Sequence, residues 1–64
     1  MIVNGKEIAL SGETTLKEYL ESKGYGLTRI AVEKNGAIIQ RQFFETEKLC
    51  NSDKIEIVSF VGGG

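Results

Sequence analysis

The sequence predicts an α+β fold in which one helix packs on a mixed sheet of four to five strands. Two Asn-Gly pairs, Asn4-Gly5 and Asn35-Gly36, stand between short β-branched runs, as in tight hairpins. A capping-box pattern precedes one short amphipathic segment. An alternating apolar and polar run near the end is typical of a final strand. With 64 residues, the chain has room for one domain with one small core.

The first half of the chain is expected to form a hairpin followed by a helix. The hairpin spans about residues 1–10, and the helix spans about residues 15–23. Thr15 is the expected N-cap, and Glu18 stands three positions later, where its side chain can reach back to the free N–H of Thr15. Gly24 stands just past the helix, where a left-handed φ is common. The apolar face of the helix consists of Leu16, Tyr19 and Leu20.

Three further strands are expected after the helix, over residues 29–34, 37–39 and 54–59. Residues 40–50 are expected to form a loop with a short helical turn, held to the core by Phe43, Phe44 and Leu49. The order strand, strand, helix, strand, strand, strand is that of a β-grasp fold. The helix then covers one face of the sheet, and the other face stays partly open.

Composition argues against several classes of function. The chain has 8 basic and 9 acidic residues, a net charge of −1 and no basic block, so we expect no nucleic-acid partner. It has no apolar run near 18 residues, so we expect no membrane association through a spanning helix. Without histidine, it lacks the usual general base, and one cysteine cannot form a metal cluster. We therefore expect a chain that is not an enzyme and binds no metal.

Single titratable residues are expected to have structural roles. Cys50 is the only cysteine, which excludes an intramolecular disulfide and favours a reducing, cytoplasmic location. Because no histidine is available to activate its thiol, Cys50 is expected to be a small half-buried hydrophobe beside Leu49 rather than a nucleophile. Asp53 and the scattered glutamates are expected to lie on a solvated face or to cap turns.

The three glycines at positions 62–64 predict the functional site. We expect a domain over residues 1–61 and a flexible Gly-Gly-Gly tail over residues 62–64, because no turn or cap requires these glycines. Residues without Cβ can pass through a narrow slot of a partner enzyme. Gly62 and Gly63 would thread the slot, and the Gly64 carboxylate would be joined to AMP, which makes it reactive towards a sulfur nucleophile. The alternative is a disordered end with no function.

A docking surface is expected beside the tail. If Ile55 and Ile57 face the core, then Val58 and Phe60 face the open side of the sheet. Exposed apolar residues next to a flexible tail indicate a surface for a partner protein, formed by Val58, Phe60 and Val61. Phe60 could instead simply cover the edge of the sheet.

The chain resembles a known family through several segments in order, which together cover nearly its whole length. They are Asn4-Gly5, Thr15-Leu16-Lys17-Glu18-Tyr19-Leu20, Ala31-Val32-Glu33-Lys34-Asn35-Gly36, Ile39-Gln40-Arg41, Asp53-Lys54-Ile55-Glu56-Ile57-Val58 and Val61-Gly62-Gly63-Gly64. They resemble the sulfur-carrier proteins of thiamin biosynthesis (ThiS type), which are relatives of ubiquitin. The resemblance implies a ubiquitin-like β-grasp fold.

The resemblance also implies a mechanism and a set of partners. A ThiF-like or MoeB-like enzyme would use ATP and Mg²⁺ to adenylate Gly64, and the chain itself would bind no cofactor. A persulfide on a cysteine desulfurase, or another sulfur donor, would convert the adenylate to a thiocarboxylate. Thiazole synthase would then accept the sulfur.

Two alternatives remain open from the sequence. The sulfur of the same carrier could go to another acceptor, namely molybdopterin, a tRNA thiolation system or cysteine. The chain could also be a non-catalytic β-grasp interaction module that docks through its sheet and whose tail has no chemical role.

Overall fold

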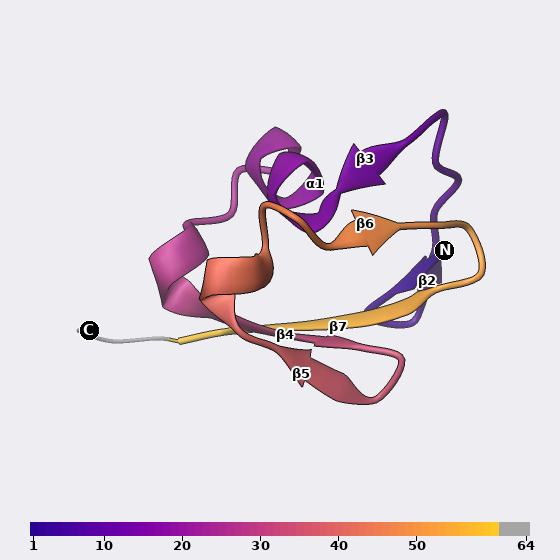
Figure 1. Ribbon diagram of the computed structural model, residues 1–64. Helices are drawn as coiled ribbons and strands as arrows, with labels where there is room; N and C mark the ends of the chain where they lie inside the picture. The colour runs from indigo at the N-terminus through magenta and orange to yellow at the C-terminus, as the bar shows by residue number, and fades with distance from the viewer. Residues whose placement is uncertain (61–64) are drawn as a thin grey trace.

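The structure, a computed structural model, describes residues 1–60. Its main feature is a five-stranded sheet in the order β2-β1-β7-β4-β5. Figure 1 shows helix α1 on one side of this sheet, so the expected packing of a helix on a mixed sheet is confirmed. The elements of the main sheet and its helix are β1 (Ile2–Val3), β2 (Lys6–Glu7), α1 (Leu16–Ser22), β4 (Ile30–Lys34), β5 (Ala37–Ile39) and β7 (Lys54–Ser59).

The N-terminal hairpin forms as expected but is shorter. The turn residues have positive φ, 50° at Asn4 and 84° at Gly5, which is the geometry that favours an Asn-Gly pair. The backbone N–H of Ile8 donates to the carbonyl of Met1 at 2.7 Å, which ends the hairpin. Beyond it, the N–H of Leu10 donates to the side-chain oxygen of Asn51 at 2.9 Å. Residues 8–10 therefore leave the sheet instead of extending the second strand.

Helix α1 confirms the capping box. The Thr15 hydroxyl accepts from the N–H of Glu18 at 3.2 Å, and the Glu18 carboxylate accepts from the N–H of Thr15 at 2.9 Å. Gly24 follows the helix with φ at 82°. Leu16 and Leu20 are completely buried, so the expected apolar face of the helix packs on the sheet.

The strands of the sheet are paired in both directions. β1 runs parallel to β7, whereas β1–β2, β4–β5 and β4–β7 are antiparallel pairs. β4 and β7 are in register over five residues, from Ile30 opposite Ser59 to Lys34 opposite Ile55. The core between sheet and helix contains Met1, Val3, Leu16, Tyr19, Leu20, Ile30, Val32, Phe44, Leu49, Ile55 and Ile57.

A second sheet, which the sequence did not indicate, lies on the helix side. It consists of β3 (Thr14–Thr15) paired antiparallel with β6 (Lys48–Leu49) (Figure 1). Two short 3-10 helices complete the secondary structure of the described residues, η1 (Leu27–Arg29) and η2 (Arg41–Phe43). η2 is the helical turn expected within residues 40–50.

The expected anchors of this segment are partly confirmed. Phe44 and Leu49 are buried in the core, as predicted, whereas Phe43 is 49% exposed. Phe43 is the last residue of η2, and its neighbour Phe44 fills the core position, so the two successive rings cannot face the same way. The expectation that Phe43 also holds the segment to the core was wrong.

Candidate functional site

Strand β7 positions the last described residues of the chain. It lies in the middle of the sheet, between β1 and β4, and carries Phe60 directly after its last residue. The N–H of Phe60 donates to the carbonyl of Arg29 at 2.8 Å, one step beyond the β4–β7 ladder. Phe60, the last described residue, is therefore held at the end of the central strand.

Asn4 holds β7 from the other side. Its side-chain amide donates to the carbonyl of Ile57 at 3.2 Å, and its side-chain oxygen accepts from the N–H of Ile57 at 2.7 Å. These two bonds continue the pairing of β7 past Val3, where β1 ends. Sequence reasoning assigned Asn4 only to the turn, because the same residue type satisfies the turn without any tertiary contact.

The expected tail lies outside the described residues. Val61, Gly62, Gly63 and Gly64 are the candidate docking and reactive residues in question, and the boundary between domain and tail falls there too. Their roles, including the flexible tail, stay predictions.

The side of the sheet opposite the helix carries exposed apolar side chains. Val58 and Phe60 on the β7 segment are each 60% exposed, and Ile38 on β5 is 71% exposed. Ile55 and Ile57, which come before Val58 on β7, are buried, so the expected inward direction of these two residues is confirmed. We name the exposed side the open face. The docking role of Val58 and Phe60 stays a prediction.

Asp53, immediately before β7, is the one buried charged residue among residues 1–60, with 5% of its surface exposed. Its carboxylate accepts from the Asn35 amide at 2.9 Å and from the N–H of Cys50 at 2.8 Å. Burial raises the pKa of this carboxyl, but the bonds from Asn35 and Cys50 and the charge of Lys34 outweigh it, so the pKa is lowered. Asp53 caps the turn, as expected, but it does not lie on a solvated face.

Cys50 is exposed, contrary to the expectation of a half-buried hydrophobe. Its sulfur lies 3.4 Å from the Asp53 carboxylate, to which the thiol can donate. The buried neighbour Leu49 fills the core position, and Cys50 points the other way because successive residues of an extended segment alternate. No sequence signal separates this arrangement from the expected one.

Lys34 links the two sheets near the start of β7. Its ammonium donates to the Glu47 carboxylate and to the carbonyl of Lys48, both at 2.8 Å, and lies 3.7 Å from the Asp53 carboxylate. The hydrogen bond to Glu47 raises the pKa of Lys34, and the nearby Asp53 charge adds to this. The pair of sheets is thus joined by charge-assisted bonds as well as by the core.

The described residues contain neither a metal centre nor a membrane-spanning helix. Over residues 1–60, no three histidine, cysteine, aspartate or glutamate side chains are grouped closely enough to hold a metal ion. In the same part of the chain, no helix has the length and apolarity that crossing a bilayer requires. An open groove of about 500 Å³ lies between residues 8–14 and helix α1, and β7 does not line it.

Comparisons with known proteins agree with this geometry. The model of the ThiS family matches residues 1–64. The curated sulfur carrier protein ThiS of Bacillus subtilis (strain 168) is 38% identical over 63 residues, covering 97% of this chain and 96% of that protein. A crystal structure of the thiamine biosynthesis protein ThiS from Geobacter metallireducens superposes with a TM-score of 0.81 at 30% identity, covering 98% of this chain and 96% of that one.

Larger proteins also contain a similar region. The thiazole synthase of Paramagnetospirillum magneticum (strain ATCC 700264 / AMB-1) is 33% identical over 64 residues, which is all of this chain but 20% of that protein. The chain thus spans about a fifth of the length of this relative. The match along residues 1–64, the full-length similarity to a curated ThiS and the shared fold confirm the resemblance and the β-grasp prediction, and the chain belongs to the ThiS family.

Proposed function

We propose that this chain is a sulfur carrier whose Gly64 carboxylate becomes a thiocarboxylate and supplies sulfur for thiazole formation in thiamin biosynthesis. Membership of the ThiS family over residues 1–64 is the observation that carries the proposal. The position of the glycines supports it, since Gly62, Gly63 and Gly64 follow strand β7 closely in the sequence. The chain acts as a protein substrate of other enzymes and does not itself catalyse a step.

The chemistry starts from an unreactive group. A carboxylate oxygen of Gly64 attacks the α-phosphorus of ATP in an adenylating enzyme of ThiF or MoeB type, which binds the Mg²⁺, and pyrophosphate leaves. A persulfide sulfur from a cysteine desulfurase or another donor then attacks the acyl carbon, and AMP leaves. A partner thiol then attacks the donor cysteine's sulfur in the acyl disulfide, forms a new disulfide with it, and releases Gly64 as the thiocarboxylate. The carrier supplies the carboxylate and the surface that is recognised.

Two parts of the chain have different tasks in this scheme. Gly62 and Gly63 lack Cβ atoms, so they can pass through a narrow slot that a larger residue would block. Ordering them costs on the order of 1–2 kcal/mol per residue, which contacts with the folded domain must offset. Val58, Phe60 and Val61 would supply those contacts, and the exposure of Val58 and Phe60 supports this role.

We infer that thiazole synthase is the acceptor. A thiazole synthase that contains a region similar to this whole chain supports the choice over molybdopterin, tRNA or cysteine. We also infer a reducing, cytoplasmic location, because the single cysteine, Cys50, can form no disulfide within the chain.

The carrier function is tested by mass spectrometry. The protein is incubated with ATP, Mg²⁺, an adenylating enzyme of ThiF type and a sulfur donor, and we expect the mass increase of one oxygen replaced by one sulfur on Gly64. Deletion of Gly64, or Gly63→Trp, should abolish sulfur acceptance, because the first removes the positioned carboxylate and the second blocks the slot. An unchanged wild-type mass would contradict the proposal.

A matched glycine substitution controls for nonspecific effects. Gly12→Ala is suitable because φ at Gly12 is not positive and an added Cβ would meet no atom within 4 Å. We expect this variant to accept sulfur like the wild type. Circular dichroism of all variants should show the same fold. Sulfur acceptance by Gly63→Trp would contradict the threading argument specifically.

A further inference from the structure

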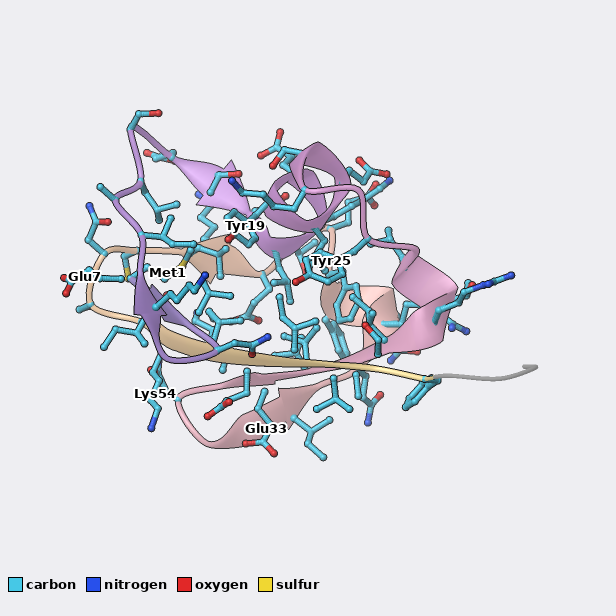
Figure 2. All side chains as sticks on the ribbon, turned by 180° about the vertical axis from the view of Figure 1, so that it is seen from behind. Met1, Glu7, Tyr19, Tyr25, Glu33 and Lys54 are labelled. Atoms are coloured by element: carbon cyan, nitrogen blue, oxygen red, sulfur yellow. The ribbon has the colours of Figure 1, made fainter. Side chains whose placement is uncertain are left out.

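Two asparagines of the chain bind to β7 in the same way. Asn4 and Asn35 each begin an Asn-Gly turn, with φ of 50° and 53°. The N–H of Asn4 donates to the carbonyl of Ile55 at 2.9 Å, and its side-chain oxygen accepts from the N–H of Ile57 at 2.7 Å. The N–H of Asn35 donates to the carbonyl of Lys54 at 2.8 Å, and its side-chain oxygen accepts from the N–H of Lys54 at 2.8 Å. Figure 2 shows Lys54 close to the turn that joins β4 to β5.

Both side chains also use their NH₂ groups. The Asn35 nitrogen donates to the Asp53 carboxylate at 2.9 Å, and the Asn4 nitrogen donates to the carbonyl of Ile57 at 3.2 Å. Aspartate in either position would keep the oxygen acceptor and lose the N–H donor. At position 35 it would also place a second carboxylate against Asp53, which is charged and only 5% exposed. The fold therefore requires an amide at both positions, and the requirement is stricter at Asn35.

The same residue pairs are chemically labile. In an Asn-Gly pair, the backbone nitrogen of the glycine can attack the side-chain amide carbon, because no Cβ obstructs the approach. A succinimide ring closes, and the amide nitrogen leaves as ammonia with the proton of the attacking N–H. Water then opens the ring at one of its two carbonyls, which gives aspartate or isoaspartate. One water is consumed for each ammonia released, and the reaction needs no enzyme or cofactor.

The native hydrogen bonds oppose this reaction at Asn35. Asn35 and Gly36 are both exposed, so water can reach them. The amide, however, is held at its oxygen by the N–H of Lys54 and at its nitrogen by the Asp53 carboxylate. Its carbon can rotate towards the Gly36 nitrogen only after these bonds have broken. The reaction therefore proceeds from a locally opened state, and its rate is proportional to the population of that state.

We propose that Asn35 is a deamidation site whose conversion to aspartate or isoaspartate separates the β4–β5 turn from the start of β7 and limits the lifetime of the folded domain. The new carboxylate and Asp53 repel each other, and isoaspartate also adds a carbon to the main chain of a tight turn. The modified domain opens more readily, which in turn exposes Asn4 to the same reaction. The inference does not depend on the proposed sulfur transfer, because it concerns the folded domain alone.

Deamidation rates test the protection by the fold. The wild type is incubated folded and in denaturing guanidinium chloride at the same pH and temperature, and peptides are followed by mass spectrometry. We expect deamidation at Asn35 to be at least about tenfold slower in the folded protein. Asp53→Ala should raise the folded-state rate several-fold at Asn35 and less at Asn4, which is the internal control. Equal rates in the folded and denatured wild type, or equal acceleration at both asparagines, would overturn the proposal.

Urea midpoints test the effect of the product. Asn35→Asp should lower the midpoint, and Asn35→Asp/Asp53→Asn, which exchanges amide and carboxylate, should recover at least about half of the loss. Asn51→Asp is the matched control and should have the wild-type midpoint, because only its side-chain oxygen is used, by the N–H of Leu10, and aspartate keeps that oxygen. A wild-type midpoint for Asn35→Asp, or no recovery in the exchanged pair, would overturn the proposal.

Discussion

Asp53 is a charged residue in the interior that is stabilised because donors surround it. Its two carboxylate oxygens accept from the Asn35 amide, the Cys50 N–H and the Cys50 thiol. Asn35 in turn accepts from the N–H of Lys54 at 2.8 Å, so the turn between β4 and β5 is tied to the start of β7. One side chain thus fixes the point from which the central strand starts.

Replacing Asp53 tests this role. Asp53→Ala leaves the N–H of Cys50 and the Asn35 amide without their acceptor, so we expect the free energy of unfolding in urea to fall by about 2 kcal/mol. Ser11→Ala, at an exposed position whose side chain makes no hydrogen bond to described residues, is the control and should change it by less than about 0.5 kcal/mol. Equal stability of Asp53→Ala and the wild type would show that the network contributes nothing.

The Asp53 carboxyl also makes stability depend on pH. Its pKa is lower in the folded chain than in the unfolded one, so the ionised form stabilises the fold. This contribution is complete above about pH 4 and is lost as the pH falls through the folded-state pKa. We expect urea midpoints of the wild type to decrease below about pH 4 more steeply than those of Asp53→Asn. Parallel curves for the two proteins would contradict this assignment.

For these residues, the sequence predicted local roles in turns better than it predicted burial. A turn cap was one of the two roles predicted for Asp53, because aspartate in a turn has a local reason to be there. Its burial was not, since that depends on Asn35 and Lys34, which are distant in the chain. Cys50 and Phe43 were placed wrongly because each has a more buried neighbour, Leu49 and Phe44, and the sequence does not say which of two adjacent apolar residues faces inward.

At the scale of elements, one residue of the capping box takes part in both helix α1 and the small sheet. Thr15 caps the helix and is also the second residue of β3, opposite Lys48. The N–H of Leu16 donates to the carbonyl of Glu47 at 2.7 Å, so the start of the helix is bonded to the segment before β6. The helix therefore begins where the small sheet holds it.

Substitution of Thr15 tests the cap. Thr15→Ala removes the acceptor for the N–H of Glu18, and we expect the free energy of unfolding in urea to decrease by about 1 kcal/mol. Thr15→Ser keeps the hydroxyl and should recover most of this loss. Thr28→Ala is the control, since the exposed Thr28 side chain makes no hydrogen bond to described residues. If Thr15→Ala and Thr28→Ala are equally stable, the box does not stabilise α1.

The elements with strong local signals were predicted correctly. Both Asn-Gly turns, the helix with its cap and the alternating strands β4 and β7 have such signals within a few residues. The small sheet of β3 and β6 was missed, because two residues are too few for a period to be visible. Its two strands lie far apart in the chain, and they pair because the helix and the core bring them together.

At the scale of the molecule, the exposed apolar residues form a surface that the fold does not need. Val58 and Phe60 are mostly exposed, while every buried position of β7 is already filled by Ile55 and Ile57. Their β-branched and aromatic character suits a strand, so the sequence alone could not separate a docking surface from ordinary strand preference. The sequence thus predicts where the open face lies, but it does not predict whether this face binds a partner.

A double substitution tests the docking role of this surface. Val58→Thr/Phe60→Ser should change the unfolding free energy by less than about 0.5 kcal/mol, because both side chains are exposed. The same variant should raise the dissociation constant for the adenylating enzyme at least about tenfold, measured by calorimetry. Phe43→Ser, an exposed aromatic in η2, is the matched control. Binding that survives the double substitution would assign docking to another face.

The central place of β7 also has a consequence for synthesis on the ribosome. β1 and β4 are both neighbours of β7 and are not neighbours of each other. Until residues 54–59 emerge from the exit tunnel, the two hairpins of the nascent chain share no strand, and their apolar sides lack a common partner. Assembly of the domain must therefore await its last strand, and a polypeptide stalled before that point would expose aggregation-prone edges to chaperones and proteases.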